Sequence, residues 1–265
     1  LQDVSKPLLS NFPKANIIIH AASQASPKFY GIDPVGTLLA NSIGTMHLLD
    51  NALKNKSDNF LFVSSGEVYG IPINPNLLVN EKDYGYLDSM NVRSCYAESK
   101  RLGETMIVAW GNQYNIHANV VRPFHTYGPG LSFNDGRVFC DFVSDIVNNR
   151  DIVLKSNGDA QRSFCYLSDA VIGIFTVLLN GKKNEAYNIG NPKTEIAIKD
   201  LASILINLFP EKKLKVRFEI KTENINYLKS NVSRCCPSID KLNELGWSPE
   251  VGIKEGFKRT VESYF

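Results

Sequence analysis

A tyrosine and a lysine stand four residues apart in this chain, at Tyr96 and Lys100. On a helix, residues at this spacing share one face, so the phenol and the ammonium can reach the same ligand. A nearby cation favours the phenolate and lowers the pKa of a tyrosine from about 10 towards the range of a general base. The Tyr-x-x-x-Lys pattern alone is common, and a surface tyrosine beside a solvated lysine is its ordinary interpretation. The surroundings of the pair must therefore decide.

Polar side chains follow two apolar stretches that are typical of buried strands. The stretch 60–64 ends in Ser64 and Ser65, with Glu67 close behind, and the stretch 16–20 leads into Ala21, Ala22 and Ser23. In open parallel sheets, ligands bind beyond the carboxyl ends of the strands, and small residues there let a cofactor approach the backbone. Strand-end capping by the serines, a solvated glutamate and simple tight packing are the alternatives for these residues.

Short apolar runs bounded by turn residues recur along the chain, at 16–20, 60–64, 118–122, 152–155 and 186–189. Such runs are typical of strands that are buried on both faces. Between the first three lie stretches with helical spacing of apolar residues, at 38–54 and 94–114. The alternation of strand and helix predicts an α/β fold with a parallel sheet.

The composition of the sequence changes after Pro123, where a loop rich in Gly, Asn and Asp runs through residue 136. Helices are expected at 137–149 and, after a late turn, at 253–264. We therefore expect a first domain at 1–130 that carries the tyrosine and the lysine. A smaller mixed α/β lobe at 131–265 should follow, with some of its segments returning to the core sheet.

Charge and cysteine content limit the classes of partner. The 265 residues include 29 Lys and Arg against 27 Asp and Glu, so the net charge of +2 gives no general attraction for nucleic acid or anionic lipid. Five cysteines without zinc-ligand spacing indicate a reduced, cytoplasmic setting and no metal site. No apolar stretch approaches the roughly 20 residues of a membrane span. We expect a soluble protein without nucleic-acid or membrane partners.

Six segments of the chain, taken in order, resemble the extended short-chain dehydrogenases that act on nucleotide sugars: 20–23, 41–45, 64–70, 96–100, 122–129 and 245–247. The resemblance covers almost the whole chain. It implies a Rossmann-like, doubly wound parallel sheet, a C-terminal lobe for the nucleotide sugar, and NAD as the cofactor. It also implies a homodimer, formed by a four-helix bundle from the stretches 38–54 and 94–114 of two copies.

Within that family the chain is most similar to UDP-glucuronate decarboxylases. The shared features are the stretch 25–27 with Tyr30 and Pro34, a Ser-Glu-Val-Tyr-Gly type of strand end, the segment 134–138, and an Arg-x-Phe-x-Tyr pattern that begins at Arg162. The resemblance implies removal of carbon dioxide from a UDP-sugar through a 4-keto intermediate. A 4-epimerase or 4,6-dehydratase, and a non-catalytic protein that binds a nucleotide sugar or dinucleotide, remain as alternatives.

The resemblance assigns roles to particular residues. Tyr96 would be the base, Ser65 would bind the reacting sugar oxygen, and Lys100 would lower the pKa of the tyrosine and hold the nicotinamide ribose. Glu67 would lie beside the outer carbons of the sugar. The residues expected at the cofactor are Ala21, Ala22, Ser23, Asn41, Ser64, Tyr96, Lys100 and Pro123, and those expected at the substrate are Tyr30, Glu67, His125, Arg137, Arg162 and Arg234.

The sequence also departs from the family pattern. Gly66 stands where sugar 4,6-dehydratases carry an Asp general acid, which disfavours dehydration because glycine cannot protonate a leaving hydroxyl. His125 replaces a usual Asn, and Lys155 replaces an aromatic residue that decarboxylases often have. The family's glycine-rich turn, which places backbone amides against the pyrophosphate, has no counterpart here and is expected to precede this segment.

Overall fold

Four parallel strands form the central sheet of the computed structural model, which describes residues 1–219 and 231–265. These strands are β1 (Ile17–His20), β2 (Asn59–Val63), β3 (Ala118–Pro123) and β8 (Ala186–Ile189), and they lie side by side in that order. Every neighbouring pair is parallel. The predicted α/β fold with a parallel sheet is therefore confirmed.

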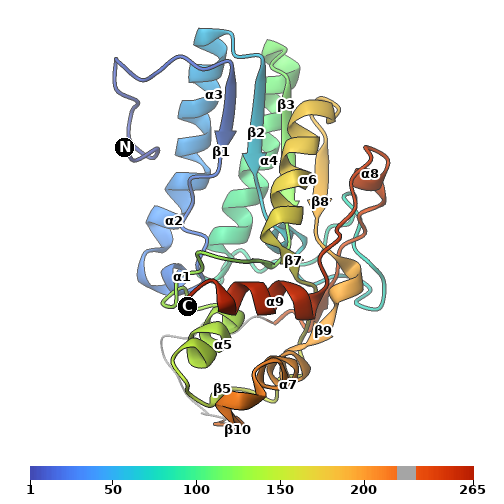
Figure 1. Ribbon diagram of the computed structural model, residues 1–265. Helices are drawn as coiled ribbons and strands as arrows, with labels where there is room; N and C mark the ends of the chain where they lie inside the picture. Colours follow the sequence, from blue (N-terminus) through green and yellow to red (C-terminus); the bar gives the residue numbers. More distant parts are fainter. Residues whose placement is uncertain (220–230) are drawn as a thin grey trace.

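Helices cover both faces of this sheet (Figure 1). On one face lie α3 (Ile43–Asn55) and α4 (Ser94–Tyr114), and on the other lies α6 (Leu167–Asn180). Strand β2 shows why both faces are apolar, because Phe60 and Phe62 pack with α3 and α4 whereas Leu61 packs with α6. This explains why the strands are continuous apolar runs rather than alternating ones.

We expected one continuous helix at 38–54. That expectation was wrong, because the structure has two helices with a break at Ser42. Helix α1 (Lys28–Ile32) leads into α2 (Pro34–Asn41), and α3 follows after a break at Ser42. The Ser42 and Thr45 hydroxyls donate to the carbonyls of Leu38 and Asn41 at 2.6 Å each. Such bonds from hydroxyl side chains to the preceding turn bend a helix, and here they accompany the break.

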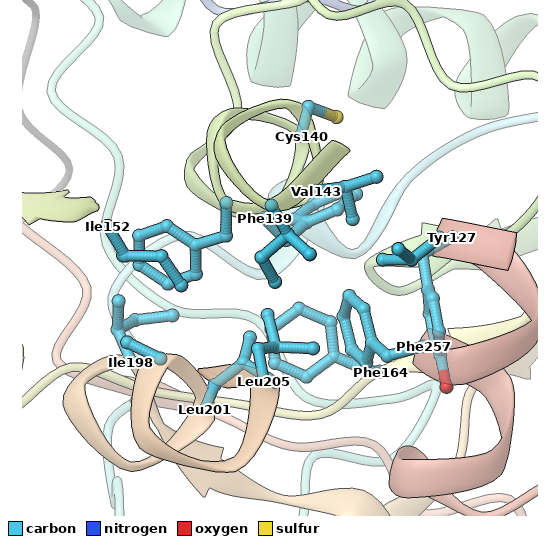
Figure 2. Close-up of a cluster of buried hydrophobic side chains, with 14 of the residues drawn as sticks. Tyr127, Phe139, Cys140, Val143, Ile152, Phe164, Ile198, Leu201, Leu205 and Phe257 are labelled. Carbon is cyan, nitrogen blue, oxygen red and sulfur yellow. The ribbon is translucent and has the colours of Figure 1, made fainter. Parts of the chain in front are cut away.

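A second hydrophobic core lies below the sheet in Figure 1. It is built by α5 (Val138–Val147), β5 (Ile152–Leu154), α7 (Ile198–Leu208) and α9 (Ile253–Glu262), with β10 (Val216–Phe218) pairing in parallel with β5. Figure 2 shows its aromatic centre, where Phe139 of α5 and Phe257 of α9 pack with Tyr127 and Phe164. We call this unit the lobe.

Short strands and turns connect the lobe to the sheet. One small sheet has the order β11 (Arg234–Cys235), β6 (Gln161–Arg162), β9 (Ile196–Ala197), and another pairs β4 (Thr126–Tyr127) with β7 (Cys165–Tyr166). The chain returns from the lobe to contribute α6 and β8 to the main sheet, and after α8 (Asp240–Asn243) it enters the lobe again. A domain boundary at 130/131 stays a prediction. Within the described residues, we find no helix of the length and apolarity that a bilayer crossing requires.

Candidate functional site

Helix α4 places Tyr96 and Lys100 at the carboxyl end of β2. Both side chains are buried, with 5% and 2% of their residue surface exposed. The Lys100 ammonium donates to the carbonyl of Val63, the last residue of β2, at 2.6 Å, and it lies 5.7 Å from the centre of the Tyr96 ring. The helical spacing of the two residues therefore brings them to one place at the edge of the sheet.

The turn after β2 brings a hydroxyl to the same place. Ser65 caps the 3-10 helix η1 (Gly66–Tyr69) by accepting a hydrogen bond from the backbone amide of Glu67 at 3.2 Å. Its hydroxyl also lies against the Tyr96 phenol, where it favours the phenolate. Gly66 packs against Phe124 so closely that a Cβ at this position would meet the aromatic ring at 3.0 Å. A side chain at position 66, acidic or not, would therefore require the Phe124 ring to shift.

Burial shifts the pKa values of Tyr96 and Lys100. It raises the pKa of Tyr96 to about 12, while Ser65 and Arg137 pull the value down and Glu67 adds to the rise. Burial lowers the pKa of Lys100 to about 7, and the neighbouring Glu104 carboxylate opposes that fall. The expected lowering of the tyrosine pKa was wrong, because the loss of hydration on burial outweighs the hydrogen bond with Ser65 and the charge of Arg137.

Tyr30 covers the Tyr96 ring, and Arg93 lies beside Tyr30 in turn. Tyr30 stacks on the Tyr96 ring with ring centres 5.1 Å apart and planes inclined by 15°. Arg93, just before the first residue of α4, lies with its guanidinium carbon 6.0 Å from the centre of the Tyr30 ring, and it forms an ion pair of 3.3 Å with Glu67. Sequence reasoning did not single out Arg93, although its place three residues before the tyrosine was a usable signal.

The end of β1 offers groups for a cofactor. Ala21 and Ala22 are exposed, and Ala22, Ser23 and Gln24 line a surface pocket of about 520 Å³. The Ser23 hydroxyl and the side-chain oxygen of Asn41 are buried without a hydrogen-bond partner among the described residues.

The other residues expected at the cofactor have neighbours of their own. The Asn41 amide donates to the hydroxyl of Ser99, on α4, at 3.1 Å. Ser64 donates its hydroxyl to Glu104 at 2.6 Å, and Pro123 is half-buried at the end of β3. Asn41 thus connects α2 to α4 directly beside Lys100.

Two further residues expected at the substrate, Arg137 and His125, lie at the lobe core. Arg137, at the start of α5, forms a hydrogen bond of 2.9 Å with Asp135, and its charge reaches Tyr96. His125 lies beside the rings of Phe139 and Phe164, and its burial lowers its pKa to about 3, with Arg162 and Arg137 adding to the fall.

The other two arginines expected at the substrate differ in their surroundings. Arg162 donates to the carbonyls of Val232 at 2.7 Å and Ser233 at 3.1 Å, and its charge reaches His125. Arg234 instead forms a 2.6 Å ion pair with Glu195 and donates to the carbonyl of Leu77 at 3.0 Å. Of the expected arginines, Arg137 and Arg162 thus lie near the other candidate residues, whereas Arg234 points to the loop at 75–77.

This arrangement is matched by a known family. The model of the NAD dependent epimerase/dehydratase family matches residues 2–190, which include β1, β2, β3 and the central pair. The chain belongs to this family. The resemblance inferred from the sequence motifs is confirmed.

Curated relatives within the epimerase/dehydratase family support a narrower likeness. UDP-glucuronic acid decarboxylase 6 of Arabidopsis thaliana is 34% identical over 264 residues, which cover 99% of this chain and 72% of that protein. UDP-glucuronic acid decarboxylase 1 of Xenopus tropicalis is 33% identical over 265 residues, covering 99% of this chain and 59% of that protein.

The UDP-glucose 4-epimerase of Thermotoga maritima, solved with UDP-glucose, has the same fold. The TM-score is 0.81 at 24% identity, and the match covers 94% of this chain and 77% of that one. At this identity the likeness concerns the fold.

Proposed function

We propose that this member of the epimerase/dehydratase family is an NAD-dependent UDP-glucuronate decarboxylase that acts through a 4-keto sugar. The observation that carries the proposal is the meeting of Tyr96, Lys100 and Ser65 at the carboxyl end of β2, with Glu67 and Arg93 next to them. The similarity to curated UDP-glucuronic acid decarboxylases over 99% of the chain supports this reaction over others in the family.

The residues present fit a dinucleotide at the end of β1. The Ser23 hydroxyl and the Asn41 side-chain oxygen are buried polar atoms without partners among the described residues, and such atoms are stabilised by a ligand that supplies hydrogen bonds. The small exposed side chains of Ala21 and Ala22 leave the backbone there accessible. Bound NAD would supply the oxidation at carbon 4 of the sugar and its reversal.

The chain's own residues then handle the proton and the sugar oxygen. Tyr96, as phenolate, removes the proton from the sugar 4-hydroxyl, and Ser65 holds that oxygen in place. Lys100 favours the phenolate by its charge. Because burial raises the pKa of Tyr96 to about 12, most of the phenol is protonated at neutral pH, and the base form depends on the groups that oppose this rise, such as Ser65 and Arg137.

Decarboxylation follows from the position of the new ketone. A ketone at carbon 4 lies β to the carboxylate, so the bond to the carboxylate carbon breaks with its electron pair delocalised into an enolate, which is then protonated. Reduction of the resulting 4-keto pentose gives UDP-xylose, and its release gives the ketone itself. Glu67, whose charge reaches Tyr96, and Arg93, its ion-pair partner, lie on the side of η1, where we place the carboxylate end of the sugar.

Replacing Tyr96 with Phe tests the base. We expect Tyr96→Phe to reduce carbon dioxide release from UDP-glucuronate by about 10²–10⁴-fold, the usual contribution of a positioned acid or base, and to leave ligand binding within a few-fold. Carbon dioxide release with added NAD and binding by calorimetry are the measurements. Tyr114→Phe, at the exposed end of the same helix, is the control and should keep full activity. Undiminished turnover by the Phe variant would contradict the assignment.

Substrate choice separates the two reactions that share this machinery. Decarboxylation predicts carbon dioxide release from UDP-glucuronate, whereas 4-epimerisation predicts conversion of UDP-glucose without it. Inertness towards the acid sugar would end the decarboxylase proposal. Dehydration is disfavoured because Gly66 has no side chain that could protonate a leaving hydroxyl, and a Cβ at this position would meet the Phe124 ring at 3.0 Å.

We also propose that the protein is a cytoplasmic homodimer. Helices α2, α3 and α4 each expose apolar side chains, which supports pairing of these helices between two copies. These side chains are Val35, Leu38, Leu53, Leu102 and Val108. None of the five cysteines is in a disulfide, which supports a reduced compartment.

A further inference from the structure

A buried ion pair lies directly behind the catalytic pair. Glu104 is one helical turn after Lys100, so that Tyr96, Lys100 and Glu104 follow one another along one face of α4. The carboxylate of Glu104 accepts hydrogen bonds from Arg122, at the end of β3, at 2.9 Å to one oxygen and 2.6 Å to the other. It also accepts the hydroxyl hydrogen of Ser64 at 2.6 Å. Glu104 thereby connects α4 to the carboxyl ends of β2 and β3.

The Arg122 guanidinium is buried and donates hydrogen bonds to several groups. It has 1% of its surface exposed, and besides Glu104 it donates to the Tyr69 hydroxyl and to the backbone carbonyl of Glu81 at 2.9 Å each. Tyr69 in turn donates to the side chain of Asn188 on β8 at 2.5 Å. A bidentate arginine in such a network fixes the carboxylate in one orientation.

Glu104 also faces Lys100 electrostatically. The charged and titratable groups around the Lys100 ammonium are Tyr96 and Glu104 from α4 and His20 from β1, while β2 contributes the Phe62 ring at 4.8 Å and the Val63 carbonyl. Burial lowers the pKa of His20 to about 4, so His20 is neutral at neutral pH. Glu104 is therefore the anion in this set that opposes the loss of the Lys100 proton.

We propose that Glu104 is a positioning residue of the reaction, which keeps Lys100 charged and fixes the strand end that carries Ser64 and Ser65. This inference rests on the proposed function for its kinetic consequence only. Glu104 acts through Lys100 and Ser64 and does not touch the sugar. Arg122 offsets part of the burial cost of the carboxylate and sets its direction, so the acid can serve the lysine without leaving its own site.

The test compares Glu104→Gln with Arg122→Lys and Glu104→Asp in the full-length protein. Glu104→Gln removes the negative charge at nearly constant shape. Arg122→Lys disturbs the same ion pair but keeps both charges. Glu104→Asp keeps the negative charge but moves it further from Lys100 and Arg122, because the side chain is one methylene shorter. Lysine labelled with ¹³C at Cε reports the titration of Lys100 by NMR, with Lys100→Met assigning the signal. Carbon dioxide release from UDP-glucuronate gives kcat and KM across the same pH range.

We expect Glu104→Gln to lower the pH at which Lys100 titrates by about one unit or more, the usual effect of losing an opposite charge within a few ångströms. The alkaline limb of kcat should move with it, and kcat should fall more than KM changes. Arg122→Lys should keep the Lys100 titration close to that of the native chain, and Glu104→Asp should shift it less than Glu104→Gln does. A lysine titration that Glu104→Gln leaves unmoved overturns the inference.

Two further readouts keep the outcome decisive. If Glu104→Gln does not fold, as judged by circular dichroism, Ser64→Ala and Glu104→Asp take its place, and unchanged kcat in both overturns the positioning role. The NMR titration needs no turnover. A shifted lysine titration in a protein that releases no carbon dioxide would therefore refute the proposed reaction while leaving the assignment of Glu104 to Lys100 intact.

Discussion

Burial governs the ionisable side chains around the candidate site. Tyr96 is kept protonated, the ammonium of Lys100 is weakened, and His20 and His125 are kept neutral, in each case chiefly because the charged form loses its hydration. Chemistry at this site therefore depends on a small number of nearby charges: Glu104 and Arg137 oppose the effect of burial on Lys100 and Tyr96, whereas Glu67 adds to it at Tyr96. Substitution of any of these should change a titration before it changes the fold.

His125 makes stability depend on pH. Its folded pKa of about 3 lies below the ordinary value of 6.5, so the unfolded chain binds the proton first as the pH falls. The contribution of a neutral His125 is fully present above about pH 6.5 and is lost progressively between 6.5 and 3. We expect His125→Asn to lose less free energy of unfolding than the native chain between pH 7 and pH 4, as measured by urea denaturation.

The comparison isolates one side chain, because His20 is present in both proteins and contributes equally. Equal losses of stability in the two proteins would show that His125 is protonated in the folded chain.

The sequence was informative about some residues and silent about others. Helical spacing alone brought Tyr96 and Lys100 together, and the apolar run before Ser64 and Ser65 located their strand end. Glu104 was not singled out, because an isolated acid on a helix resembles a solvated one until the fold brings Arg122 beside it. Motif spacing contains no information on burial, so the direction of the tyrosine pKa could not be read from it.

At the level of elements, the site depends on close approach between α4 and its neighbours. Gly103 lies where α4 crosses β2 and α2, and a Cβ there would meet the Phe62 ring at 2.5 Å and the Asn41 carbonyl oxygen at 3.1 Å. Because Phe62 is fully buried, neither contact can relax without moving the helix. Since Lys100 and Glu104 flank this position, the geometry of the site follows from this packing.

Gly103→Val tests that packing. Overpacking of a tight core costs about 1–3 kcal/mol, and we expect at least the upper part of that range because both neighbours are rigid. Ala109→Val, at an exposed position of the same helix, should cost only about 0.5 kcal/mol through helix propensity. Chemical denaturation gives both values. Equal destabilisation by the two substitutions would show that α4 can move away from β2 at little cost.

The spacing of apolar residues could not predict where a helix breaks, and it could not predict a helix that is apolar on most sides. The periodicity of 38–54 runs through Ser42, so nothing in the spacing of apolar residues marked the break that hydroxyl-to-carbonyl bonds accompany. Helix α6 was not expected, because it is apolar on most sides and lacks a polar face to reveal its period. By contrast, α4 was predicted with its observed bounds, because its apolar and polar residues alternate at helical spacing.

On the scale of the whole molecule, the hydrophobic core around the sheet and the core of the lobe differ in how far the sequence predicts them. The sheet core follows from apolar runs that any reading of the sequence detects, so the α/β class was predictable. The lobe core joins α5, α7 and α9 with strands of two or three residues, and such short pairings depend on contacts between segments far apart in the chain. Local pattern could not supply them.

The proposed dimer is testable at this scale. We expect light scattering at micromolar concentration to give twice the mass of one chain, and Leu102→Glu on α4 to reduce it towards that of one chain, because a charge would enter an apolar interface. Leu179→Glu, an equally drastic change at an exposed position on α6 across the sheet, should leave the mass unchanged. A native protein that scatters as a single chain would refute the dimer.

The position of α9 in the lobe core determines an order of events during synthesis. Phe257 and Val261 are fully buried against Tyr127 and the helices α5 and α7. A growing chain therefore exposes this aromatic cluster until residues 253–262 have left the ribosome, by which time β1, β2, β3 and β8 have already been made. The segments that carry Tyr96, Lys100 and Ser65 are therefore made before the lobe core can close, so the proposed proton-transfer residues precede the proposed substrate lobe in the order of synthesis.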